Sequence, residues 1–181
     1  MLTANDVADF FLSSIDSEPD GENISNLKLQ KLLYYAQGIA LSILGRPLFM
    51  DPICHWQHGP VVSPVYHQYK SYGSAPLPIS YIEPEKYQEE DILVLNYVRR
   101  EYGQYSAWKL RDMTHQEEPW LATANGSIIS LEMMNTFFKN KVGWTFDYDF
   151  KRIKERVEGT FVAMPDSVVS HDDFEAWIKA Q

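Results

Sequence analysis

The sequence predicts a mainly α-helical protein: a compact multi-helix single domain with at most a small β element, followed by a C-terminal extension. Three observations support this class. Apolar residues recur with helical spacing in successive segments between residues 4 and 138. Capping residues and Gly or Pro stop signals bound most of these segments. The alternation that is typical of strands is confined to short stretches.

The first helix is expected over residues 4–15. Thr3 and Asp6 form a capping-box pattern at its start. Apolar side chains then recur on one face, at Val7, Ala8, Phe11, Leu12 and Ile15. The polar stretch 17–23 predicts a surface loop.

A second helix is expected between Ser25, a favoured N-cap residue, and the stop signals Gly45 and Pro47. Its apolar stripe consists of Leu29, Leu32, Leu33, Ala36, Ala40 and Ile43. Gly38 lies in its interior, where glycine costs up to ~1 kcal/mol relative to alanine. We therefore expect another backbone to pack closely there, from the first helix or from the His-Gly-Pro turn.

The other face of this helix has two interpretations. Several polar side chains can lie outside the apolar stripe, namely Lys28, Lys31, Tyr35, Gln37 and Ser42. Tyr34 can lie on one border of the stripe or the other. Such a face is either solvated or an interaction surface, since tyrosine offers a large contact area at low entropy cost. The pattern alone favours neither.

Residues 53–58 alternate weakly and predict one short strand, after which Gly59 and Pro60 impose a turn. A third helix is expected from Ser63 to the terminator Gly73. Its inward side chains are expected to be Val65, Tyr69 and Tyr72.

Further helices follow an extended loop over residues 74–84. One ends at Gly103, the next begins at Ser106, Pro119 opens a short turn, and Ser130 caps the last helix. Their apolar positions are Ile92, Leu95, Val98, Tyr102, Leu110, Met113, Met134, Phe137 and Phe138.

The pattern changes near residue 143, so we expect a domain over residues 1–142 and an extension over residues 143–181. Within the extension, residues 160–164 predict a short strand and Ser170 caps a short helix. The apolar face of that helix either docks on the core or binds a partner. The 181 residues, 45% of them hydrophobic, suffice for one sizeable core.

Composition also limits the function. No apolar run approaches the roughly 20 residues that span a bilayer, and the N-terminal residues lack signal-peptide features, so we expect a cytoplasmic protein without membrane association. The single cysteine, Cys54, excludes an internal disulfide framework. A net charge of −9 argues against direct nucleic-acid binding, because an acidic surface repels phosphates, and it favours a basic protein partner.

Candidate metal ligands and nucleophiles do not form a recognisable catalytic pattern. The possible ligands are Cys54, His55, His58, His67 and His115, whose spacing fits no common zinc site. Neither a GxSxG elbow nor a GxxxxGK[ST] loop occurs. Glu117 and Glu118 read as adjacent surface acids. We therefore expect neither catalysis nor a metal or other cofactor; a metal-dependent hydrolase that uses Cys54, His58 and His115 is the less favoured alternative.

Four blocks of residues resemble the Panacea, or SocA-like, antitoxin domain of toxin-antitoxin systems. They are LKLQKLLYYAQG (27–38), GRPLF (45–49), WQHGPVVSPVY (56–66) and HQEEPW (115–120). Their order and spacing are similar to those of the family, and the resemblance covers about residues 3–142. It implies a bacterial or phage protein.

The resemblance implies an antitoxin that neutralises a cognate protein toxin by direct, non-catalytic binding. The toxins associated with this family include enzymes related to alarmone synthetases. Some members instead act as adaptors that deliver a toxin or another client to a Clp-type protease. This is the alternative function, for which residues 174–181 could provide a tether.

Two groups of residues in this chain match signature positions of the family. The partner-binding group implied by the resemblance consists of Lys28, Lys31, Tyr34, Tyr35 and Tyr66. The structural group consists of Gln30, Gly59, Pro60, Val61, His115 and Trp120.

Overall fold

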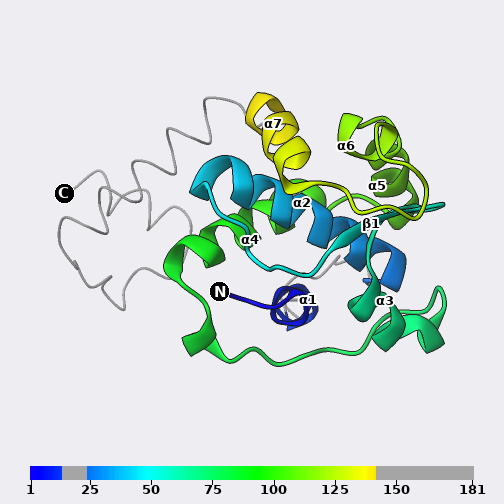
Figure 1. The fold of residues 1–181 in the computed structure, drawn as a ribbon. Helices are drawn as coiled ribbons and strands as arrows, with labels where there is room; N and C mark the ends of the chain where they lie inside the picture. Colours follow the sequence, from blue (N-terminus) through cyan, green and yellow to red (C-terminus); the bar gives the residue numbers. More distant parts are fainter. Residues whose placement is uncertain (14–23, 142–181) are drawn as a thin grey trace, which may run out of the picture. The chain divides into compact units, whose positions relative to one another are not determined.

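A long central helix, α2 (Asn26–Leu44), organises the fold, because most other elements pack against it (Figure 1). The computed structural model describes residues 1–13 and 24–141. The elements that contact α2 are α1 (Ala4–Ser13), β2 (Gly59–Val62), α3 (Ser63–Tyr69), α4 (Glu89–Tyr102), α5 (Ala107–Thr114) and α7 (Leu131–Lys141). Within the described ranges the chain forms seven α-helices and one two-stranded sheet, so the predicted mainly α class is confirmed.

The ends of the helices follow the capping signals of the sequence. Ser25 accepts a hydrogen bond from the backbone N–H of Lys28 at the start of α2, and Gly45 ends this helix with a left-handed φ of 66°. Ser106 and Ser130 accept the corresponding bonds at the starts of α5 and α7. Because each bond satisfies a backbone N–H that has no partner within the helix, these predicted boundaries are confirmed.

The β element is a hairpin rather than the single predicted strand. β1 (Ile53–Trp56) pairs antiparallel with β2, with Ile53 opposite Val62 and Trp56 opposite Gly59. The prediction missed β2 because Gly59 and Pro60 resemble a turn; they are instead the first residues of a strand. A further segment lies along the other edge of β1, where Ile129 N donates to Ile53 O at 2.8 Å.

Three short helical elements follow or precede the longer helices. The 3-10 turn η2 (Lys70–Tyr72) follows α3, η3 (Pro84–Lys86) precedes α4, and α6 (Glu118–Leu121) follows α5. Tyr72 is 42% exposed, so the expectation that it faces inward is wrong. Since α3 gives way to η2 just before Tyr72, the helical period no longer directs this side chain to the core.

The interior of α2 is approached closely at Gly38, but by a side chain and not by the backbone that the sequence predicted. A Cβ atom on Gly38 would lie 2.1 Å from Cε2 of Phe138. The expected neighbours, the first helix or the His-Gly-Pro turn, are therefore wrong. An aromatic side chain of α7 uses the space that the missing Cβ leaves.

Some expectations fall outside the described residues. They concern Ile15, the loop 17–23, and the strand and helix of the extension. The domain boundary at residue 142 also stays a prediction. No helix in the part of the chain that the structure describes is long and apolar enough to cross a membrane.

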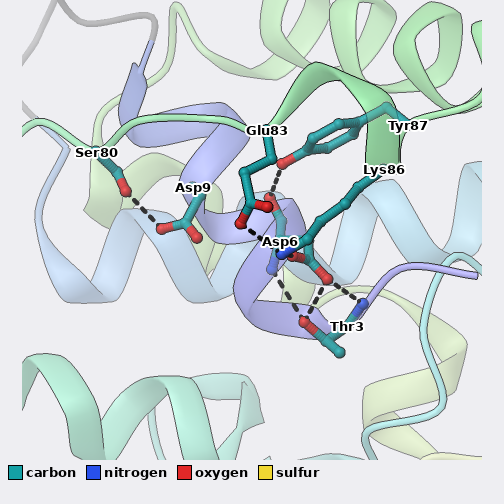
Figure 2. A network of polar contacts seen from close by, with 7 residues as sticks. All are labelled: Thr3, Asp6, Asp9, Ser80, Glu83, Lys86 and Tyr87. Atoms are coloured by element: carbon teal, nitrogen blue, oxygen red, sulfur yellow. Dashed lines mark hydrogen bonds and ion pairs between the residues drawn. The ribbon is translucent and has the colours of Figure 1, made fainter.

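A polar network joins α1 to the segment before α4 (Figure 2). Asp6 Oδ2 accepts hydrogen bonds from Thr3 N at 2.7 Å and Thr3 Oγ1 at 2.6 Å, which confirms the predicted capping box. Lys86 Nζ lies 3.3 Å from Asp6 Oδ1, and Tyr87 Oη donates to Asp6 O at 2.7 Å. Burial acts to raise the pKa of Asp6, but the bonds from Thr3 and Lys86 outweigh it, and this pKa lies below 3.8.

We expect Asp6→Asn to lower the free energy of unfolding by about 1 kcal/mol at neutral pH. A carboxyl whose pKa is lower in the folded state stabilises the protein above its unfolded pKa, and this contribution is lost as the pH falls through the folded pKa. The difference between the wild type and the variant should therefore shrink below pH 3.8. Urea denaturation over this range measures it; a difference independent of pH contradicts the assignment.

We expect Gly38→Ala to destabilise the protein by about 1–3 kcal/mol, because the added methyl group collides with the ring of Phe138. This loss exceeds the gain of up to ~1 kcal/mol in helix propensity. A double-mutant cycle with Phe138→Leu tests the cause by urea denaturation. The smaller side chain should relieve part of the cost, whereas strictly additive losses contradict a collision at this position.

Candidate functional site

The residues predicted to bind a partner on α2 lie in the interior. Lys28 is 2% exposed, and Lys31, Tyr34 and Tyr35 are 0% exposed. The expectation that these side chains stand on an open face is wrong, because other elements cover α2 on all sides. Tyr66, on α3, is partly exposed. Their role in partner binding stays a prediction, and the four buried residues can affect a partner only through what they hold in place.

Buried amides of α2 bind backbone groups of the hairpin and α3. Gln30 Oε1 accepts a hydrogen bond from Val62 N at 2.8 Å, and Gln30 Nε2 donates to Asn26 Oδ1 at 3.1 Å. Asn26 Nδ2 donates in turn to Tyr66 O at 3.0 Å. A buried backbone N–H without a partner costs about 1–3 kcal/mol, so Gln30 takes the place of a neighbouring strand along this edge of β2.

A third buried amide of α2 fixes the link between α2 and β1. Gln37 Oε1 accepts a hydrogen bond from Leu48 N at 2.9 Å, and Gln37 Nε2 donates to Phe49 O at 2.7 Å. Sequence analysis placed Gln37 outside the apolar stripe, which suggested contact with solvent or a partner. The structure uses the same position for the backbone of a connecting segment.

Lys31 lies beneath the start of β2. Its Nζ donates to Pro60 O at 2.8 Å. Burial, and to a smaller extent the Arg111 guanidinium, lowers the pKa of Lys31 from 10.5 to about 7. Gly59 has a φ of 98°, and a Cβ atom there would lie 2.7 Å from Lys31 Cε and 2.9 Å from Thr114 Oγ1. Glycine is therefore required both by the backbone conformation and by the lysine beside it.

The HQEEPW segment brackets the hairpin from the other side. His115 Nε2 lies 3.0 Å from Gln57 O, and Trp120 Nε1 donates to Trp56 O at 3.3 Å. The rings of His55 and His115 lie on the Trp120 ring, with centroid distances of 4.1 and 4.0 Å. The structure thus brings together two sequence blocks, 56–66 and 115–120, through residues that are 58 and 64 positions apart in the chain.

The candidate metal ligands do not converge on one point, because His55 and His115 each contact a backbone carbonyl group. His55 Nδ1 lies 2.6 Å from Thr123 O, and His115 Nδ1 lies 2.7 Å from Arg111 O. Cys54 is half-buried in β1, and His58 is exposed at the hairpin. Among the residues for which the structure gives positions, no group of three or more His, Cys, Asp or Glu side chains could hold a metal ion.

Glu117 is buried, so its expected place among the surface acids is wrong. Its Oε1 atom accepts a hydrogen bond from Tyr35 Oη at 3.1 Å and another from Lys141 Nζ. Burial, with the Glu117 charge adding to it, raises the pKa of Tyr34 and of Tyr35 above the ordinary tyrosine value. The sequence signal for this site is weak, because only the fold brings α2 to the segment between α5 and α6.

An aromatic surface lies on and beside the hairpin; we call it the hairpin aromatic surface and define it as Trp56, His58, Tyr66, His67 and Trp108. Trp108, on α5, is 61% exposed, and its ring lies 6.0 Å from that of His58. The ring centroids of Trp56 and Tyr66 are 5.0 Å apart, and those of Tyr66 and His67 are 5.5 Å apart. Of these five residues, only Tyr66 was predicted to bind a partner. Helical spacing does not show which side of a short helix stays uncovered.

We expect the stability of the wild type to rise with pH between 7 and 10.5 relative to Lys31→Met. In this window the unfolded state binds more protons at Lys31 than the folded state does, so the stability difference should rise by up to about 1.4 kcal/mol per pH unit. Urea denaturation at successive pH values measures it. Lys139→Met, on the exposed surface of α7, is the control. Its free energy of unfolding should change with pH in parallel with that of the wild type. Parallel curves for Lys31→Met contradict the lowered pKa.

Comparison with known proteins identifies the family of this fold. Residues 29–121, from the first turns of α2 to the end of α6, match the family described as antitoxin SocA-like, Panacea domain. This range covers half of the chain. It includes the hairpin, most of the block 27–38 on α2 and the block 115–120. Neither the curated proteins nor the solved structures include a match. The predicted resemblance is confirmed: the chain belongs to the SocA-like Panacea family of antitoxins.

Proposed function

We propose that this protein is a non-catalytic antitoxin that neutralises a cognate protein toxin by binding it, and that the hairpin aromatic surface is where the toxin docks. The observation that carries the proposal is the exposure of Trp108 beside His58, with the Arg111 guanidinium 5.9 Å from the Trp108 ring. Trp, Tyr and Arg are the residues most enriched among those that dominate binding energy at protein interfaces.

The surface is supported by a rigid frame. Gln30 and Lys31 hold the backbone of β2 from below, and His115 and Trp120 hold the hairpin turn and the end of β1. A backbone fixed in this way loses little further backbone entropy on binding, which favours affinity. The buried signature residues therefore contribute to toxin binding by positioning the hairpin.

The charge of the chain agrees with a protein partner. The net charge of −9 favours association with a basic protein over association with nucleic acid. The family associates with toxins of several chemistries, and an enzyme related to alarmone synthetases is one candidate.

We expect Trp108→Ala to weaken binding of the toxin encoded beside this protein by roughly ten- to a hundredfold, because it removes an exposed aromatic anchor. Isothermal titration calorimetry measures the dissociation constant, and growth during co-expression measures neutralisation. Tyr81→Ala is the matched control, since Tyr81 is also an exposed aromatic residue, at 90% exposure, but lies in the loop before α4. Circular dichroism verifies that both variants are folded.

Three outcomes contradict parts of this proposal. A neighbouring product that is harmless alone, or one that stays toxic in complex with this protein, contradicts the antitoxin function. Equal effects of Trp108→Ala and Tyr81→Ala contradict the assigned surface. A toxin that disappears from cells only when a Clp-type protease is present supports the adaptor alternative instead, which a toxin half-life measurement detects.

A further inference from the structure

Lys141, in the last turn of α7, places its ammonium group among four aromatic rings. Nζ lies 5.1 Å from the ring centroid of Tyr35, 5.5 Å from that of Phe137, 5.8 Å from that of Tyr102 and 5.9 Å from that of Phe138. Cations within about 6 Å of a ring centroid are attracted by the ring quadrupole. Glu117 Oε1 accepts a hydrogen bond from the same ammonium. We call the four rings and the Glu117 carboxylate the ammonium cage.

Three of the five side chains of the cage come from elements other than α7, which supplies Lys141. Tyr35 comes from α2, Tyr102 from the end of α4, and Glu117 from the link between α5 and α6. The rings of Tyr35 and Tyr102 stack at a centroid distance of 3.9 Å. Tyr35 Oη also donates to Glu117 Oε1, so the carboxylate and two rings form one connected unit apart from Lys141.

The chemistry of the cage selects a primary ammonium group. The Glu117 side chain is 6% exposed, and a buried carboxylate is costly unless it is paired and hydrogen-bonded. Its Oε2 atom is buried and has no hydrogen-bond partner among the described residues, so it can accept a further donor. A suitable occupant carries both a positive charge and several N–H donors. A quaternary ammonium lacks the donors, and an alcohol lacks the charge.

The occupant is accessible although the carboxylate is not. The side chain of Lys141 keeps 31% exposure against 6% for Glu117. Lys141 comes from α7, whereas Tyr35 and Tyr102 of the cage belong to α2 and α4. The lysine can therefore withdraw without unfolding α2 or α4.

We propose that the ammonium cage is an exchangeable binding site for a primary ammonium group, which Lys141 fills in the free protein and which an ammonium group of another molecule can occupy in its place. The ligand is a free alkylamine or a lysine side chain, since both present the same chemistry. The proposal does not depend on the antitoxin function, because it concerns a site within the isolated chain.

The test uses Lys141→Ala in the full-length chain, with n-butylammonium chloride as the probe. We expect the melting temperature of the variant without probe to be lower than that of the wild type. At a probe concentration a hundredfold above the Kd, the melting temperature of the variant should rise by about 5–10 °C. The methylene protons of the bound probe should shift upfield in NMR spectra, because they lie near four ring faces. With the wild type both effects should require higher concentrations of the probe, because the probe must displace Lys141 from the cage.

The controls separate this site from general salt effects. Lys139→Ala removes an exposed lysine two residues away on the same helix and should not respond to the probe. Tetramethylammonium and 1-butanol should not stabilise Lys141→Ala. The double variant Glu117→Gln/Lys141→Ala should lose the response, because it removes the carboxylate that accepts the N–H donors.

A blocked lysine, Nα-acetyl-lysine N-methylamide, distinguishes the two sources of the ligand. Stabilisation of Lys141→Ala by both amines indicates that the cage accepts a lysine side chain, and stabilisation by n-butylammonium alone restricts it to free alkylamines. An equal response of the wild type and Lys141→Ala, or no response of the variant, overturns the proposal. So does a Lys141→Ala variant that stays unfolded with the probe while the double variant folds.

Discussion

The structure depends on the hydrogen bonds of three buried side chains of α2, Gln30, Lys31 and Gln37. A helix covered on every side cannot leave an amide or an ammonium in its interior without a partner, since the lost hydrogen bonds to water cost several kcal/mol. Gln30, Lys31 and Gln37 meet this constraint by binding backbone groups of β2 and of the link before β1. The same bonds satisfy backbone groups of β2 and of the link before β1, so α2 and these segments stabilise each other.

This arrangement separates the frame from the surface that it presents. Gln30 and Lys31 of α2 hold β2 from one side, and His115 and Trp120 hold the hairpin turn and the end of β1 from the other. What stays open is the hairpin aromatic surface, on which Trp108 is 61% exposed. Substitutions on this surface leave the buried hydrogen bonds of the frame intact.

Local sequence signals predicted the helices well and the exposure of their polar side chains poorly. Capping at Ser25 and Ser130 depends on residues within one turn, and the structure contains both caps. The exposure of Lys31 depends instead on which elements surround α2, and polarity alone indicated the wrong side. Glu117 was misplaced for the same reason, because its partners Tyr35 and Lys141 come from distant parts of the chain.

The sequence by itself determined the helical class, most helix ends and the family, because periodicity, capping and short motifs are local properties. The tertiary structure decided that Phe138 is the neighbour of Gly38, that Gly59 begins a second strand, and that the lysines and tyrosines of α2 lie inside. It also decided which aromatic side chains face solvent. These outcomes depend on packing between segments far apart in the chain, and a polar side chain is stable in the interior only where such packing supplies its hydrogen-bond partner.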